Sequence, residues 1–223
     1  GATHNLNVRV SVAGDTYLGN DSISNYFFRN SPIVSSFPYL EDFEQGDGGF
    51  YSVGFKNSWQ YGTPAAIKTK KAASGTKAWK TNLKGSYQNL ELSYLYSPCF
   101  DISALANPML SFSAAMDIEN CGNILCDAAY VECSFDGNIW TKLGSVGQGT
   151  NWYDSTFNLW NTEGFTRWHV ASVPLPNPGA GASIRFRFVL STDPGVINEG
   201  VAIDDIHIFD RKNAILPATG IAT

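Results

Sequence analysis

Charged residues are scarce in this chain of 223 residues. Lys, Arg, Asp and Glu together make up 16% of the sequence, whereas roughly a quarter is usual for a soluble domain. The net charge is −5, and no cluster of Lys or Arg has aromatic residues between its members. This pattern argues against a nucleic-acid partner, which needs a basic surface. Because no apolar run approaches transmembrane length, we also expect no membrane insertion.

Helical periodicity is also lacking. No stretch of twelve or more residues keeps an apolar period of 3.6, whereas glycine (21 residues) and aromatic rings (6 Trp, 10 Tyr, 14 Phe) are plentiful. Short alternating segments follow one another instead. In IRFRFVL (184–190) the even-numbered apolar residues share one face and the two arginines share the other, and LSFSAAMDI (110–118) alternates equally well. These strands predict an all-β protein, an antiparallel jelly-roll β-sandwich.

The sandwich is expected to occupy residues 37–210. Residues 1–36 alternate separately, and GDTYLGNDS within them is typical of a hairpin turn. Two strands are not a stable unit alone, so we expect this segment to be an N-terminal extension or the end of a preceding domain. Residues 211–223 have no periodicity and are predicted to be a linker. Because the sequence opens directly on a strand pattern, we expect a piece of a larger protein.

Motifs for catalysis are missing as well. The three histidines form no H-E-x-x-H pattern, and the chain has neither a G-x-S-x-G elbow nor a phosphate-binding glycine loop. Asp117 and Glu119 lie two residues apart on one strand face, a spacing that a glycosidase could use but that is common in strands. We therefore expect a non-catalytic protein, with a jelly-roll glycoside hydrolase or lyase as the less favoured alternative.

Cysteines are few, but they lie close together. Cys99, Cys121, Cys126 and Cys133 include no C-x-x-C pair, which disfavours a zinc site. A disulfide is the preferred interpretation, with Cys121–Cys126 closing a small loop, although the sequence alone allows three pairings. A disulfide would suit a secreted or cell-surface protein.

The stretch GVAIDDIHIF (200–209) has apolar residues on both faces and two adjacent aspartates in its middle. Strict alternation puts Asp204 on one face and Asp205 on the other, so one carboxylate must point inward. A carboxylate between Ala202 and Ile206 needs a cation, a salt bridge or several hydrogen-bond donors. A flat strand cannot aim both aspartates at one cation, so two ligands here would require a β-bulge.

A long irregular segment, residues 144–167, separates two of the predicted strands. It carries Trp152, Tyr153 and Trp160, which have less reason to be buried than aromatic residues within strands. Exposed rings of this kind stack on sugars or anchor protein partners. The alternative is that the segment folds back and its rings cover one end of the sandwich.

Several motifs occur in a characteristic order along residues 37–210, and together they resemble one family. They are LEDFEQG, AWKTNLKGSY, LYSPCFDIS, PMLSFSAAMDIE, VECSFDGNIWTKLG, GTNWY, RWHVASVPL and IRFRFVLSTDPGVINEGVAIDDIHIF. The series resembles the MAM-like jelly-roll domains of secreted bacterial proteins, a group that includes the cleaved-adhesin domains of gingipain-type proteins. Residues 5–36 are similar to the last strands of an immunoglobulin-like repeat that precedes such domains.

The resemblance implies a structural calcium ion between the opening DFE and the closing IDDI segments. Its ligands would be Glu44, accompanied by Asp42, and Asp204 or Asp205, with Asp117 as a further candidate and loop carbonyls completing the shell. The ENCGNILCD insertion, with its two cysteines, departs from the family pattern.

The resemblance also implies the kind of function. It favours a non-catalytic adhesion or accessory module of a larger secreted or cell-surface bacterial protein, connected to neighbouring domains of the same chain. Its partner would be a glycan or an extracellular protein. The alternative is a carbohydrate-binding module proper, in which Trp152, Tyr153 and Trp160 form the sugar platform.

Overall fold

The computed structural model describes residues 3–9, 13–14, 16, 22–29, 33–163, 166–177, 179 and 183–211. The chain divides into two compact units, Gly1–Ile33 and Val34–Thr223. In the first unit, β1 (Thr3–Arg9) and β2 (Ser22–Arg29) form an antiparallel two-stranded ribbon. Most of the predicted turn at 14–22 lies outside the described residues, as does the predicted linker except for Arg211.

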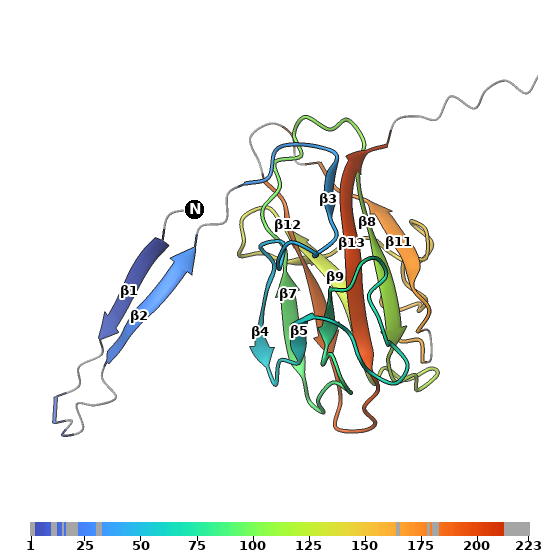
Figure 1. The fold of residues 1–223 in the computed structure, drawn as a ribbon, viewed down its shortest axis with the longest axis horizontal. Helices are drawn as coiled ribbons and strands as arrows, with labels where there is room; N and C mark the ends of the chain where they lie inside the picture. The colour runs from blue at the N-terminus through green and yellow to red at the C-terminus, as the bar shows by residue number, and fades with distance from the viewer. Residues whose placement is uncertain are drawn as a thin grey trace, which may run out of the picture. The chain divides into compact units, whose positions relative to one another are not determined.

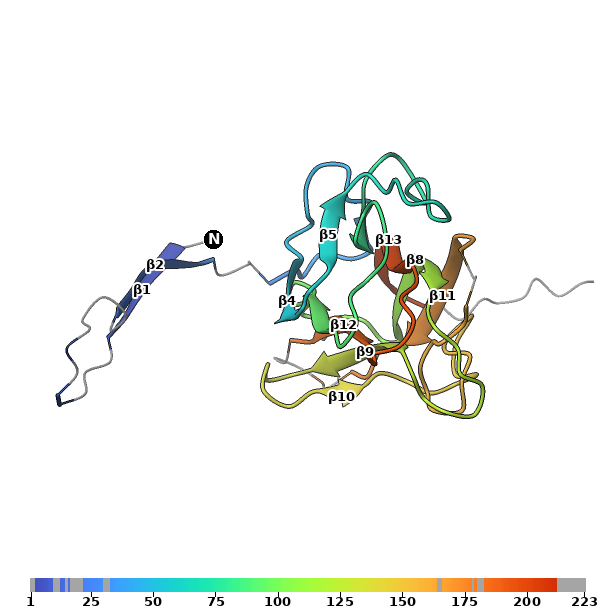
Figure 2. The same cartoon turned by 90° about the horizontal axis from the view of Figure 1, so that it is seen from below.

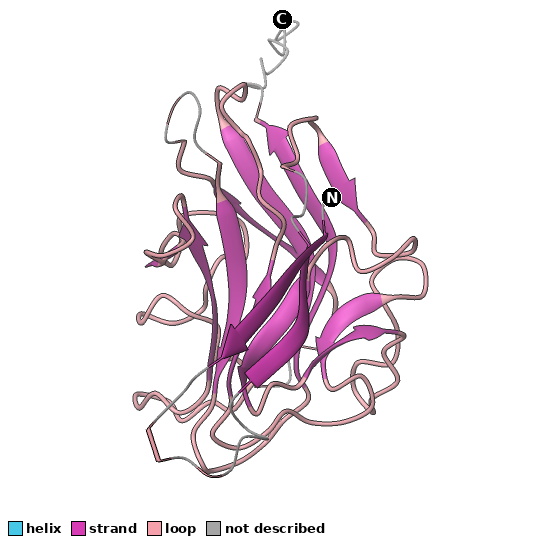
Figure 3. Cartoon of the chain, turned by 90° about the vertical axis from the view of Figure 1, so that its left-hand side faces the viewer, coloured by secondary structure: helices cyan, strands magenta, loops and turns pink. Residues whose placement is uncertain are grey.

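The second unit is built of strands and loops, and no helix occurs in the part of the chain that the structure describes (Figure 3). Consequently no described helix is long and apolar enough to cross a membrane. The strands of this unit are β3 (Tyr39–Glu41), β4 (Tyr51–Phe55), β5 (Trp59–Gly62), β6 (Ala78–Thr81), β7 (Leu92–Tyr96), β8 (Pro108–Asp117), β9 (Ala128–Ser134), β10 (Thr141–Lys142), β11 (His169–Pro174), β12 (Arg185–Ser191) and β13 (Gly200–Asp210).

These strands form two antiparallel sheets that pack face to face (Figures 1 and 2). The five-stranded sheet has the order β10-β9-β12-β7-β4. The six-stranded sheet has the order β11-β8-β13-β6-β5, and β3 pairs with the C-terminal part of β13. Consecutive strands such as β7, β8 and β9 alternate between the sheets. The architecture confirms the predicted jelly-roll β-sandwich.

The alternation in the sequence determines which side chains enter the space between the sheets. On β12, Phe186 and Phe188 are buried, while Arg185 and Arg187 lie on the opposite face. On β8, Phe112 is buried, and its ring meets that of Phe188 edge to face at 4.9 Å between centroids. Each such ring removes a large apolar area from water, so the rings form the principal contact that joins the two sheets.

A β-bulge interrupts the pairing of β13 with β8. Asp204 lies opposite Ser113 and His207 lies opposite Ser111, so β13 has one residue more than β8 over this interval. The bulge includes Asp205. The φ angle of Asp205 is 50°, in the left-handed region, which Asp tolerates better than most residues do.

The bulge changes which residues of β13 enter the core. Before it, Val201 and Ile203 belong to the core; after it, Ile206 and Ile208 do. Strict alternation over the whole strand, with odd- and even-numbered residues on opposite faces throughout, is therefore wrong. The bulge reverses the pattern at Asp205, and the chain keeps apolar residues facing inward on both sides of it.

The predicted disulfide is confirmed. Cys121 and Cys126 are bonded to each other in the loop between β8 and β9. The other two cysteines are free thiols, and Cys133 is buried in the core.

Candidate functional site

The three loop aromatics do not form an exposed platform. Trp152, Tyr153 and Trp160 are 1%, 5% and 3% exposed and belong to the core. Their segment folds back so that Trp152 and Trp160 both pack edge to face on Phe112 of β8. The expectation that these rings are accessible is wrong, and the alternative in which they cover the sandwich is the one the structure adopts.

The polar ends of these rings explain why they can be buried. The indole N–H of Trp152 donates to the carbonyl of Leu143 at 3.0 Å, and the Tyr153 hydroxyl donates to the same carbonyl at 2.9 Å. The indole N–H of Trp160 donates to the carbonyl of Asn151 at 3.2 Å, and the backbone of Trp160 forms two hydrogen bonds with Ala129 of β9. With their donors satisfied, the rings are buried without leaving an unpaired polar group.

Three of the predicted calcium ligands converge on one loop, residues 72–77. Asp204 Oδ2 accepts hydrogen bonds from the backbone N–H groups of Ala73 and Ser74 at 2.9 and 3.1 Å. The Ser74 hydroxyl donates to Asp205 at 2.6 Å, which is possible because the bulge turns Asp205 toward the same loop. The carboxylate of Glu44 accepts from the N–H groups of Thr76 and Lys77 in the same way.

Several hydrogen-bond donors therefore satisfy the carboxylate of the buried Asp204. Such donors were one of the three solutions that the sequence left open, beside a cation and a salt bridge. Asp204 is fully buried, and burial raises its pKa to about 6 while the N–H groups of Ser74 and Asp205 oppose this rise. The set of oxygen donors fits calcium in kind, since calcium prefers carboxylates and backbone carbonyls. In the described chain, however, both Asp204 oxygens already accept hydrogen bonds.

The other two predicted ligands have different partners. Asp42 is exposed and accepts a hydrogen bond from the N–H of Glu44 within its own turn. Asp117 pairs in register with Gly200, near the start of β13, and forms a salt bridge with Lys68 at 2.7 Å. The inclusion of Asp117 in the calcium site is thus corrected, because it lies four residues along β8 from Ser113, the partner of Asp204, or about 13 Å.

A different trio of carboxylates comes together just beyond the C-terminal end of β8. Ligand atoms of Glu119, Asp127 and Asp193 all lie within 4.8 Å of one another. Asp127 is fully buried, and burial raises its pKa. Glu119 thus belongs to this trio, whereas Asp117 forms a salt bridge with Lys68.

The most unusual surface of the molecule was missed by the sequence analysis. It is the outward face of the five-stranded sheet, where strand pairing aligns Tyr51, Tyr96, Arg187, Glu132 and Lys142 in one row across five strands. We call this row, together with the adjacent Tyr94, Tyr130 and Trp140, the aromatic face. Its residues come from a span of 92 positions in the sequence (51 to 142) and from a further strand near position 187. Only the pairing register of the strands brings them together.

Arg187 is the centre of the aromatic face. Its guanidinium carbon lies 4.3 Å from the ring centre of Tyr94 and 4.2 Å from that of Trp140. It also donates to Glu132 at 2.6 Å and to the Tyr96 hydroxyl at 2.6 Å. These contacts fix a planar cation among aromatic rings, so the side chains lose little further freedom when a ligand binds.

The edge of the aromatic face is open to solvent along β4. Tyr51 stacks on Tyr96 with ring centroids 5.2 Å apart and is 42% exposed, and Val53 and Phe55 beyond it are 46% and 64% exposed. Together these three side chains form an exposed apolar strip along β4. The alternation of YSVGF in the sequence indicates that Tyr51, Val53 and Phe55 share one face of a strand. It does not indicate which face of that strand other residues cover.

Comparison with known proteins places the fold. No family model matches the chain. Bacillopeptidase F of Bacillus subtilis (strain 168) is 27% identical over 176 residues, which are 78% of this chain and 11% of that protein. The chain therefore spans about a tenth of the length of this relative.

Two solved structures have a similar fold over most of this chain. The carbohydrate-binding module TmCBM61 in complex with β-1,4-galactotriose matches with a TM-score of 0.50 and 14% identity, over 78% of this chain and 99% of that one. The K1 cleaved adhesin domain of Lys-gingipain from Porphyromonas gingivalis W83 matches with a TM-score of 0.46 and 15% identity, over 79% of this chain and 100% of that one. At these identities the likeness shows the β-sandwich fold.

Proposed function

We propose that this chain is a non-catalytic module that binds glycans on the aromatic face. The observation that carries the proposal is the arrangement around Arg187, in which flat rings and hydrogen-bonding groups are held together at one surface. Sugars present apolar C–H faces and a rim of hydroxyl groups. The rings of Tyr51 and Trp140 would stack on the former, and Glu132 and Arg187 would hydrogen-bond the latter.

The same surface supports a binding role and not a catalytic one. Hydrolysis of a glycosidic bond needs two carboxyl groups on either side of the scissile bond. Among the residues that define the aromatic face, Glu132 is the single carboxylate, and it is already paired with Arg187 at 2.6 Å. The resemblance in fold to a galactotriose-bound carbohydrate-binding module favours the same conclusion.

The setting that we propose is a larger secreted or cell-surface bacterial protein. The Cys121–Cys126 disulfide supports an oxidising compartment. We also propose that a calcium ion stabilises the module near Glu44, Asp204 and Asp205, which is supported by their convergence on residues 72–77. Calcium would supply the positive charge that these three carboxylates lack.

A glycan array followed by calorimetric titration tests the glycan proposal. Trp140→Ala and Tyr51→Ala should weaken binding roughly tenfold to thirtyfold, the effect of removing a central aromatic anchor. Trp168→Ala is the matched control for Trp140→Ala, because Trp168 is also a half-buried tryptophan but precedes β11 of the six-stranded sheet, where its indole N–H donates to the carbonyl of Lys71. Equal affinity of all variants, or no bound glycan, would contradict the proposal.

An extracellular protein is the second candidate ligand, favoured by the exposed strip of Val53 and Phe55. Strand β4 is an edge of its sheet, so its backbone is open to a further strand from a partner. If the array is blank, Phe55→Asp should abolish adhesion to matrix proteins while Trp140→Ala leaves it unchanged.

A further inference from the structure

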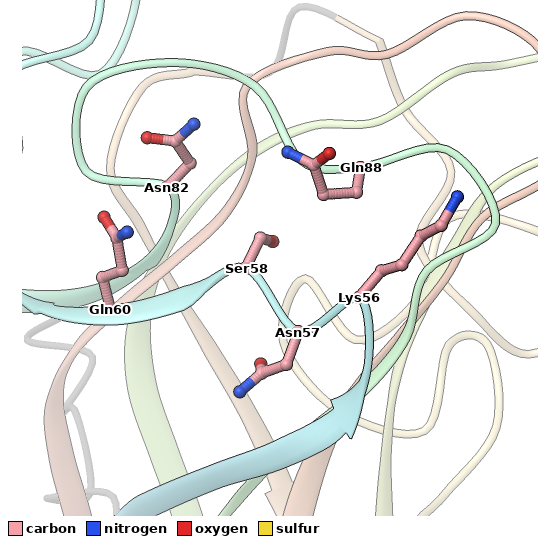
Figure 4. A pocket seen from close by; sticks show the side chains of 6 residues that line it. All are labelled: Lys56, Asn57, Ser58, Gln60, Asn82 and Gln88. Carbon is pink, nitrogen blue, oxygen red and sulfur yellow. The ribbon is translucent and has the colours of Figure 1, made fainter.

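An open polar pocket of about 400 Å³ lies where β4 ends and β5 begins. This is within the range of volumes of small-ligand sites. Figure 4 shows its lining, in which Ser58 lies between carboxamide side chains that come from β5 and from the loop after β6. The lining residues are Lys56, Asn57, Ser58, Gln60, Asn82 and Gln88.

The carboxamides around Ser58 are held in different ways. Oε1 of Gln60 accepts from the N–H of Leu83 at 2.9 Å, which leaves the NH₂ group of Gln60 without a partner in the described chain. Nδ2 of Asn82 donates to the carbonyl of Ser86 at 2.9 Å. The carboxamide of Gln88 has no hydrogen-bond partner among the residues that the structure describes, so all its polar groups are available.

The floor of the pocket is fixed by a buried carboxylate. Glu91 is 1% exposed, and it accepts from the N–H and the hydroxyl of Ser58 at 2.9 and 2.8 Å and from the N–H of Gln88 at 3.0 Å. It therefore ties the two walls of the pocket together. Its negative charge beneath the floor disfavours an anionic ligand.

The chemistry of the lining indicates a neutral ligand with many hydroxyl groups. A carboxamide offers a donor and an acceptor side by side, and each hydroxyl of a sugar is itself a donor and an acceptor. The one charged lining residue, Lys56, donates to the carbonyl of Asn89 at 2.9 Å and so already has a partner. No carboxylate lines the pocket.

The lining of the pocket begins at the residue that follows the exposed strip of β4. Tyr51, Val53 and Phe55 project from the same side of β4, because they pair with Tyr96, Tyr94 and Leu92 of β7, and Lys56 follows directly. The exposed strip is about 13 Å long from Tyr51 to Phe55. The strip runs from the stacked rings of Tyr51 and Tyr96 to Phe55, which precedes the lining residue Lys56.

We propose that this pocket is a second subsite, which binds the hydroxyl groups of one terminal sugar residue of a glycan whose chain lies along β4. This inference rests on the proposed glycan-binding function and adds to it a preference for chain ends. Gln60 and Gln88 would donate to and accept from neighbouring hydroxyls. Glu91 is a positioning residue that holds Ser58 and Gln88 in place.

Side-chain NH₂ resonances allow the pocket to be observed independently of the aromatic face. The probes are galactose, glucose, mannose and xylose, and then β-1,4-linked trisaccharides of galactose and xylose, titrated into ¹⁵N-labelled protein. The expected result is a saturable shift of the Gln60 and Gln88 NH₂ signals. Gln88→Leu should weaken binding about tenfold, the effect of losing a hydrogen-bonding group. Gln45→Leu, at an exposed glutamine outside the pocket, should have no effect.

Each outcome decides the proposal. If trisaccharides bind and Trp140→Ala weakens them, but the NH₂ signals stay fixed and Gln88→Leu binds normally, the subsite is wrong and the proposed function stands. If no oligosaccharide depends on Trp140 while monosaccharides shift the NH₂ signals in a Gln88-dependent way, the subsite stands and the proposed face is wrong. If no probe shifts these signals, the subsite is overturned.

Discussion

The buried ammonium group of Lys80 binds several backbone carbonyls, a role that a metal ion often has in a loop-rich protein. It is 1% exposed, and its ammonium group donates to four backbone carbonyls, those of Thr81, Asn82, Gly85 and Glu199, at 2.7–3.2 Å. Burial lowers its pKa to about 8. The four carbonyls join the loop after β6 to the start of β13, so one charge organises two segments that are distant in sequence.

Lys80→Met should therefore destabilise the protein by about 2–4 kcal/mol, because buried carbonyls would lose their donor while the apolar stem is kept. Urea denaturation measures the change. Lys84→Met, at an exposed lysine in the same loop, should stay within about 0.5 kcal/mol of wild type. A loss for Lys80→Met as small as that control would show that the carbonyls find other partners.

Among the strands, β13 depends most on a single residue. The bulge at Asp205 lets both aspartates reach the loop 72–77 and moves the inward face from Ile203 to Ile206. Without the extra residue, a flat strand would turn Ile206 and Ile208 outward, since a shift of one residue exchanges the faces.

Deletion of Asp205 should accordingly prevent cooperative folding, whereas Asp205→Asn should cost only about 1–2 kcal/mol. Asn tolerates the left-handed φ of 50° equally well but weakens the bonds from Ser74 and Ser113. Near-UV circular dichroism with thermal melting distinguishes the two cases. A native spectrum for the deletion variant would mean that β13 can be re-registered.

Some features of the strands and loops could be predicted from the sequence, and others could not. Alternation correctly predicted which face of β8 and of β12 enters the core, because the apolar residues of that face pack between the sheets. It could not predict that Trp152 would be buried, since burial there depends on a loop folding back on Phe112. The row of Tyr51, Tyr96 and Arg187 was equally hidden, because pairing register between distant strands is a tertiary property.

At the scale of the whole molecule, two groups of acidic residues in the described chain bear on calcium binding. The first comprises Glu44, Asp204 and Asp205 around residues 72–77, and the second comprises Glu119, Asp127 and Asp193. The resemblance in sequence implied calcium at the first. The hydrogen bonds there show that N–H and hydroxyl donors satisfy the carboxylates.

We predict that calcium raises the free energy of unfolding of the module when it is added back after a chelator has been used and removed. At a hundredfold excess over Kd the gain is about 2.7 kcal/mol, which corresponds to a rise of roughly 5–10 °C in Tm for a domain of this size. Magnesium should be less effective, because it demands a stricter octahedral shell. Thermal melting with and without each ion measures the effect, and an unchanged Tm in calcium would show that the prediction is wrong.

Two near-isosteric variants then locate the ion. Glu44→Gln keeps an acceptor for the N–H groups of Thr76 and Lys77 but removes the charge, so it should abolish the rise in Tm while leaving the calcium-free protein folded. Asp127→Asn makes the same change of charge in the other trio and should leave the calcium response intact. The opposite pattern would assign the ion to Glu119, Asp127 and Asp193. In that case the hydrogen bonds from Ala73, Ser74 and the N–H of Asp205 would satisfy Asp204, and its burial would need no cation.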